Sequence, residues 1–68
     1  MNEEALNATV RKFLKKVGIT SQREIEVAVR DAVANGRLMG NESLLAKATI
    51  RVEGLKLTFD IEGDIELE

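Results

Sequence analysis

The side chains that most often carry out catalysis are scarce in this chain. It has no histidine, cysteine, tyrosine or tryptophan. Its hydroxyl nucleophiles are serines and threonines, and no histidine is present to activate them. Ser21 is better explained as a helix cap. We therefore expect no enzymatic activity, no catalytic or cofactor-binding residues, no cofactor and no small-molecule substrate.

Four basic residues gather within one predicted helix and are the candidate partner-binding residues. We refer to them as the basic cluster: Arg11, Lys12, Lys15 and Lys16. Such a group is often only the solvated face of an amphipathic helix. The alternative is a binding site for phosphate or for an acidic partner. The acidic C-terminal strand of the same or of a second chain would be one such partner.

A row of acidic residues shares one face of a predicted strand. The row consists of Asp60, Glu62, Asp64 and Glu66. It is superficially similar to a calcium loop, but Gly63 is fourth counting from Asp60, whereas an EF-hand needs glycine sixth. Same-face neighbours on a strand lie about 6.5–7 Å apart, which is too far for an obvious shared ion. We expect no metal site, and interpret the row as a solvated face that blocks unwanted sheet pairing.

Length and composition indicate one small domain, residues 1–68. Without cysteine or histidine, neither a disulfide nor a usual structural metal can stabilise it, so a homodimer is a reasonable expectation.

No apolar run is long enough to span a membrane, and the acidic N-terminus does not resemble a signal peptide. We expect a cytoplasmic protein without a membrane partner. The net charge of −2 argues against a nucleic-acid partner.

Two helices are predicted in the first half of the chain, at about 3–17 and 21–35. Gly18 suits a left-handed residue that ends the first helix. Ser21 and Glu24 have the spacing of a capping box that begins the second. Gly36 follows its end, and Glu26 and Arg30 are spaced for an i,i+4 ion pair.

An ordered loop, 37–46, with at most a short helical turn or strand, should lead to a β region at 47–67. Apolar and polar residues alternate there, which predicts a hairpin. A turn at Glu53-Gly54 would pair Val52 with Leu55. A turn at Gly54-Leu55 would pair Val52 with Leu57, and the pairing of opposite charges slightly favours this second register. Gly63 allows one long strand, a bulge or a turn into a short third strand.

The predicted fold class is α+β, with two helices packed on one face of an antiparallel hairpin or three-stranded meander. The expected core is apolar and draws on both halves of the chain: Leu6, Val10, Phe13, Leu14, Val17, Ile25, Val29, Val33, Ile50, Val52, Leu57, Phe59 and Ile61.

The segment 11–32, RKFLKKVGITSQREIEVAVRDA, resembles the central block of a family of short, uncharacterised, largely proteobacterial proteins. The MNEE start and the EGDIELE ending are also similar. The resemblance implies a free-standing, soluble bacterial protein. It implies no activity, and no functional residue can be carried over from the family.

Our hypothesis is a small non-catalytic interaction module that binds an unknown protein partner or itself, through the basic cluster or an open strand edge. The alternative is a winged-helix-like nucleic-acid binder, because helix, Gly18-Ile19-Thr20, helix and hairpin follow one another. Against it, Glu24 occupies a position where that motif usually has a buried aliphatic residue, and the hairpin lacks an arginine-rich wing.

Overall fold

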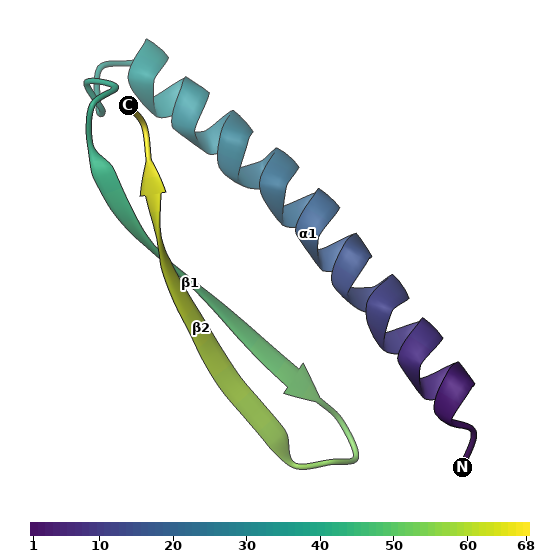
Figure 1. The fold of residues 1–68 in the computed structure, drawn as a ribbon. Coiled ribbons are helices and arrows are strands. Elements are labelled where there is room, and N and C mark those ends of the chain that lie inside the picture. Colours follow the sequence, from purple (N-terminus) through teal and green to yellow (C-terminus); the bar gives the residue numbers. More distant parts are fainter. The chain divides into compact units, whose positions relative to one another are not determined.

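The computed structural model describes all residues, 1–68, as one helix followed by a two-stranded antiparallel sheet. Helix α1 spans Glu3–Ala34, strand β1 spans Ser43–Val52 and strand β2 spans Leu57–Glu66 (Figure 1). The chain divides into two units, Met1–Arg37 and Leu38–Glu68. The α+β class is therefore confirmed, whereas the prediction of two helices is wrong.

Helix α1 is capped at both ends by its own chain. The side-chain oxygen of Asn2 accepts a hydrogen bond from the N–H of Ala5 at 3.0 Å, which satisfies one of the free donors of the first turn. At the other end Gly36 has a φ of +83°, the left-handed conformation that glycine adopts without strain. The N–H of Arg37 bonds to the carbonyl of Ala32 at 2.9 Å, and the N–H of Gly36 bonds to that of Val33 at 3.2 Å. This pair of bonds is a Schellman motif, and it confirms the expected helix end near Gly36.

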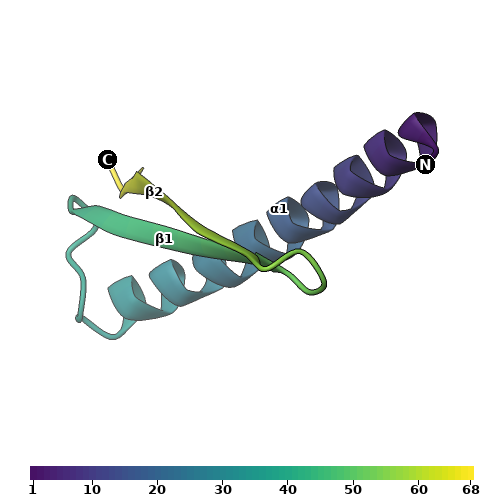
Figure 2. The same ribbon diagram turned by 90° about the horizontal axis from the view of Figure 1, so that it is seen from below.

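The helix continues through the segment where the sequence predicts a break (Figures 1 and 2). Gly18 does not have a positive φ, so it is not a left-handed helix end. Ser21 is inside the helix and caps nothing. A break would leave up to four carbonyls and four N–H groups without intrahelical partners, whereas a helical glycine costs only about 1 kcal/mol relative to alanine. Without a proline to force a break, continuation is favoured.

The segment between α1 and β1 is an ordered loop, as expected, but it is shorter than predicted. Strand β1 begins at Ser43, so part of the expected loop and the start of the predicted β region at Lys47 are corrected. Leu44 continues the alternation of Ala46 and Ala48 toward the N-terminus. The adjacent apolar Leu45 interrupts that alternation, which is why the sequence alone places the strand too late.

The hairpin adopts the register favoured by charge pairing. Val52 pairs with Leu57, Ile50 with Phe59, and Lys47 with Glu62. The connecting loop, 53–56, differs from the predicted type II′ turn. The N–H of Leu55 bonds to the carbonyl of Val52 at 3.4 Å, and Gly54, at the third turn position, has a φ of +89°. A positive φ at that position alone is typical of a type II turn.

Strand β2 is a single long strand, so the predicted third strand is wrong and no bulge forms at Gly63. Gly63 pairs with Ala46 inside an unbroken ladder. The ladder puts its apolar residues on one face, among them Ile50, Val52, Leu57, Phe59 and Ile61.

Neither unit encloses a core of its own, since one is a single helix and the other a two-stranded sheet. Ala32, 9% exposed, is the one buried apolar residue, and Phe13 is 49% exposed. A two-stranded hairpin is marginally stable alone, so its apolar face requires a cover. The predicted core, in which helix and sheet pack together, and the single domain 1–68 stay predictions.

Candidate interaction surfaces

The basic cluster lies in the N-terminal half of α1. At about 100° per residue, Arg11, Lys12 and Lys15 project away from the apolar stripe that contains Leu6, Val10 and Val17. Lys16 lies at the border of that stripe, beside Phe13. All four are exposed. Arg11 and Lys15 are an i,i+4 pair, as are Lys12 and Lys16. Like charges at this spacing destabilise a helix by a few tenths of a kcal/mol per pair.

No acidic residue neighbours the basic cluster along α1. Between Glu4 and Glu24 the chain has five basic residues, the cluster and Arg23, and no acidic residue. The positions three and four residues away from each member of the cluster hold only neutral or basic side chains. The one ion pair in the structure lies elsewhere on α1, where Arg30 contacts Glu26 at 3.7 Å as the sequence predicts. The cluster is therefore a local concentration of positive charge without a counter-charge.

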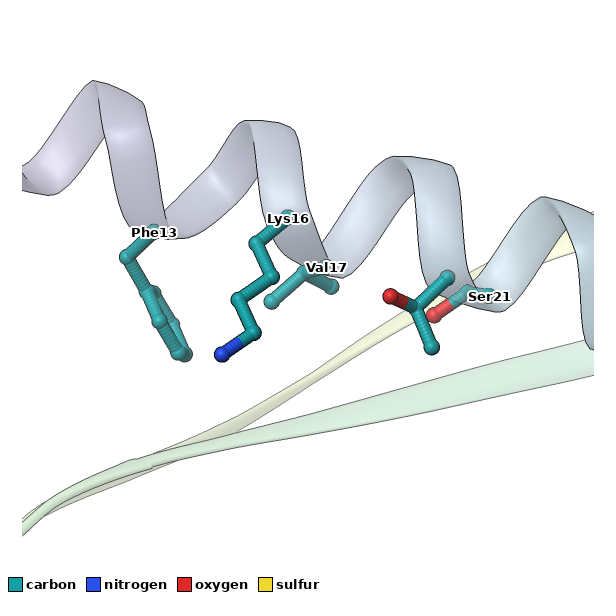
Figure 3. Close-up of a pocket in the computed structure, with 5 residues that line it drawn as sticks. Phe13, Lys16, Val17 and Ser21 are labelled. Carbon is teal, nitrogen blue, oxygen red and sulfur yellow. The ribbon is translucent and has the colours of Figure 1, made fainter.

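A shallow hollow borders the basic cluster at Lys16. Its volume is about 300 Å³, and it is lined by residues of α1 alone: Phe13, Lys16, Val17, Thr20 and Ser21. Figure 3 shows the Phe13 ring and the Lys16 side chain projecting to the same side of the helix. The hollow combines an ammonium group, two hydroxyls and an aromatic face. It has no general base, so it suits a contact with another molecule better than a chemical step.

The predicted acidic row lies on the polar face of the hairpin, opposite residues of β1. The hydroxyl of Thr49 donates to the Asp60 carboxylate at 2.7 Å, and that of Ser43 donates to Glu66 at 3.2 Å. No three histidine, cysteine, aspartate or glutamate side chains are grouped so that they could hold a metal ion. All four acids of the row are exposed, and two of them, Asp60 and Glu66, accept these bonds from β1.

Glu42 organises the loop before β1, and the sequence interpretation missed it. Its carboxylate accepts hydrogen bonds from the backbone N–H groups of Met39 and Gly40, both at 2.9 Å, and of Asn41 at 3.2 Å. These bonds, led by the one from Met39, hold the pKa of Glu42 below its ordinary value, because they stabilise the charged form. The available signal was an acid directly after the turn dipeptide Gly40-Asn41.

The structure lacks the geometry of a helix-turn-helix motif. Phe13 and Val29, which the winged-helix interpretation assigns to two helices, lie in one helix. The two-helix arrangement is wrong, while the alternative function, nucleic-acid binding, is not tested by this and stays a prediction. Although α1 is long, no stretch of it has the apolar character that a membrane-crossing helix requires.

Comparison with known proteins identifies the chain by family alone. No curated protein and no solved structure matches it. Residues 1–68 match a family described as a family of unknown function, DUF6494, which confirms the resemblance to an uncharacterised family. The proteobacterial origin and the cytoplasmic location stay predictions. Since the match covers the whole sequence, the chain belongs to the family of unknown function DUF6494.

Proposed function

We propose that this protein is a small, non-catalytic interaction module that binds an acidic polypeptide through the basic cluster. The observation that carries the proposal is the isolation of the cluster: four exposed cations on one helix, with no acidic residue between Glu4 and Glu24. Opposite charges at i,i+4 spacing stabilise a helix, as Glu26 and Arg30 do, and the cluster has no such partner on α1.

Energetics support an acidic partner. The two like-charge pairs of the cluster cost the free chain a few tenths of a kcal/mol each. A carboxylate placed near each pair removes that repulsion and adds charge-assisted hydrogen bonds. The Phe13 side of the adjacent hollow offers apolar contact to the same partner. A short acidic segment with an apolar residue therefore fits this surface.

Net charge favours a short acidic segment over duplex nucleic acid. Residues 38–68 contain three basic and seven acidic residues, a net charge of −4. A duplex presents dense charge along its whole length and would meet this repulsion, whereas a short segment meets the cluster locally. Nucleic-acid binding is the second candidate function, because the acid-free stretch of α1 also suits phosphate groups.

Binding of two polyanions by the wild type and two variants tests the proposal. The probes are fluorescent poly-L-glutamate and mixed-sequence duplex DNA, titrated at low salt. The cluster variant carries R11Q, K12Q, K15Q and K16Q. The matched control carries R37Q, K47Q, R51Q and K56Q, which removes the same charge elsewhere in the chain. Far-UV circular dichroism checks that both variants stay folded.

We expect poly-L-glutamate to bind the wild type and the control, and to bind the cluster variant at least tenfold more weakly. Equal loss in both variants would show that only net charge matters, and would contradict a site on α1. Binding of DNA but not of poly-L-glutamate would replace the proposal by the nucleic-acid alternative. In that case four cations limit the slope of log K against log salt to about −3.6.

A further inference from the structure

The free edge of β1 presents unpaired backbone groups, and the ladder shows which residues supply them. The N–H of Leu67 donates to the carbonyl of Glu42 at 3.0 Å, so these two residues form a hydrogen-bonded pair in the register of the hairpin. Such pairs alternate along an antiparallel ladder. Even-numbered residues of β1 therefore bond to β2. The odd-numbered ones direct their N–H and C=O groups to the free edge: Ser43, Leu45, Lys47, Thr49 and Arg51.

The free edge of β2 is protected by charge. By the same alternation, its outward backbone groups belong to even-numbered residues: Thr58, Asp60, Glu62, Asp64 and Glu66. Pairing two β2 edges antiparallel would place acids opposite acids. Like charges directly opposite one another destabilise a sheet, and charged edges are a common protection against edge pairing.

The free edge of β1 is less protected, since its only charges are Lys47 and Arg51. Strand β1, SLLAKATIRV, contains no acid, glycine or proline. Its polar face also carries a large apolar side chain, Leu45, which is 73% exposed. A long strand rich in β-branched and aliphatic residues with an open edge is a template for another strand. The two edges of this hairpin therefore differ in kind.

We propose that a second copy of the chain pairs with the free edge of β1, antiparallel and two-fold symmetric about Ala48, giving a four-stranded sheet in the order β2, β1, β1, β2. In this register Lys47 lies opposite Thr49 of the second copy, and Leu45 lies opposite Arg51 of the second copy. Ala48 meets its own equivalent in a pair without hydrogen bonds, where a small side chain tolerates the shorter Cα separation of about 4.5 Å. No like charges face each other.

Two competing arrangements are less favourable. Shifting the symmetry axis to Lys47 would place that ammonium opposite its equivalent. Pairing β1 with β2 of the next chain would match opposite charges, but it is head-to-tail and leaves a free β1 edge on each added chain, so it does not close. The two-fold arrangement uses both β1 edges and leaves the acidic β2 edges outermost, where they stop further addition. It uses a surface other than the basic cluster.

Two proline variants at one rung of the ladder test the proposal. Lys47 and Glu62 face each other in the hairpin, and both direct their N–H groups away from the partner strand. Proline at either position therefore leaves the hydrogen bonds of the hairpin intact and removes one N–H donor from a free edge. K47P removes it from the edge of β1, and E62P removes it from the edge of β2. Sedimentation equilibrium over a wide concentration range, with circular dichroism as the folding check, measures the assembly.

We expect the wild type and E62P to dimerise and K47P to be monomeric. A monomeric wild type, or dimers of both variants, would overturn the proposal, the latter because the contact would then lie elsewhere. Loss of assembly in both variants, or growth of the wild type beyond a dimer, would indicate head-to-tail pairing and also overturn it.

If K47P does not fold, a milder variant, L45K, tests the proposed dimer. It places a lysine opposite Asp64 within the hairpin, which favours the hairpin, and opposite Arg51 of the second copy, which opposes the dimer. We expect the dimer dissociation constant to rise on the order of tenfold, since two such pairs form per dimer. An unchanged dissociation constant would overturn the proposed register.

Discussion

Replacing Gly18 by alanine distinguishes one continuous helix from two helices by the sign of the stability change. In α1 Gly18 is helical, without a positive φ, and an added Cβ meets no atom within 4 Å. The substitution therefore introduces no clash and recovers the full difference in helix propensity, about 1 kcal/mol of stabilisation. If Gly18 instead ended a helix in the left-handed conformation, alanine would cost roughly 1–2 kcal/mol.

Urea unfolding followed by far-UV circular dichroism measures this change. With an m value of about 1–2 kcal/mol/M, 1 kcal/mol shifts the unfolding midpoint by about 0.5–1 M urea. We expect the midpoint of G18A to rise. Gly36 is the matched control, because an added Cβ there also meets no atom, yet its φ is +83°. The midpoint of G36A should fall by a similar amount. A lower midpoint for G18A would refute the continuous helix.

Two further predictions concern Asn2, which caps the start of α1, and Glu42, whose carboxylate binds the loop before β1. N2A should destabilise α1 by about 1 kcal/mol, whereas N2D, which keeps the capping oxygen, should be nearly neutral in the same urea assay; equal losses would contradict the cap. Because the pKa of Glu42 is lowered in the folded state, the stability it contributes is present above its unfolded pKa and is lost as pH falls through the folded value. Carboxyl NMR titration should give Glu42 a midpoint below that of an ordinary glutamate, with the amide shifts of Met39 and Gly40 following it. A midpoint at the ordinary value would contradict the hydrogen-bonded loop.

The hairpin was predictable from the sequence because its signals are local. Alternation from Lys47 to Ile61 defines two faces, and cross-strand charge pairing selects the observed register. The turn type was not predictable to the same degree, because glycine can supply a positive φ at either central position. Leu45 concealed the start of β1, since it places an apolar residue on the polar face.

The sequence predicts two helices because the apolar residues of α1 lie on two different sides of the helix in its two halves. At about 100° per residue, the stripe from Leu6 to Val17 and the stripe from Ile25 to Val33 are offset by about 80° around the axis. Each half has its own amphipathic pattern, and Gly18 and Ser21 between them match the signals of a helix end and a helix start. The helix is continuous because its backbone hydrogen bonds continue through Gly18 and Ser21, and the pattern of side chains carries no signal of these bonds.

The residues of the basic cluster were found from the sequence because their spacing places them together on any helix. The absence of acids between Glu4 and Glu24 can also be read from the sequence. That residues 18–20 are helical neighbours of Lys15 and Lys16 follows only from the continuation of α1 through Gly18. Glu42 was missed because its role depends on three backbone N–H groups converging on one carboxylate. Loop geometry of that kind has only a weak sequence signal.

The most direct test of the proposed function is an NMR titration of the isotope-labelled chain with poly-L-glutamate. We predict that the amide shifts change most around Arg11, Lys12, Lys15 and Lys16, and that the changes disappear at high salt. Changes centred on Lys47, Arg51 and Lys56, or spread evenly over all basic residues, would contradict a binding site on α1.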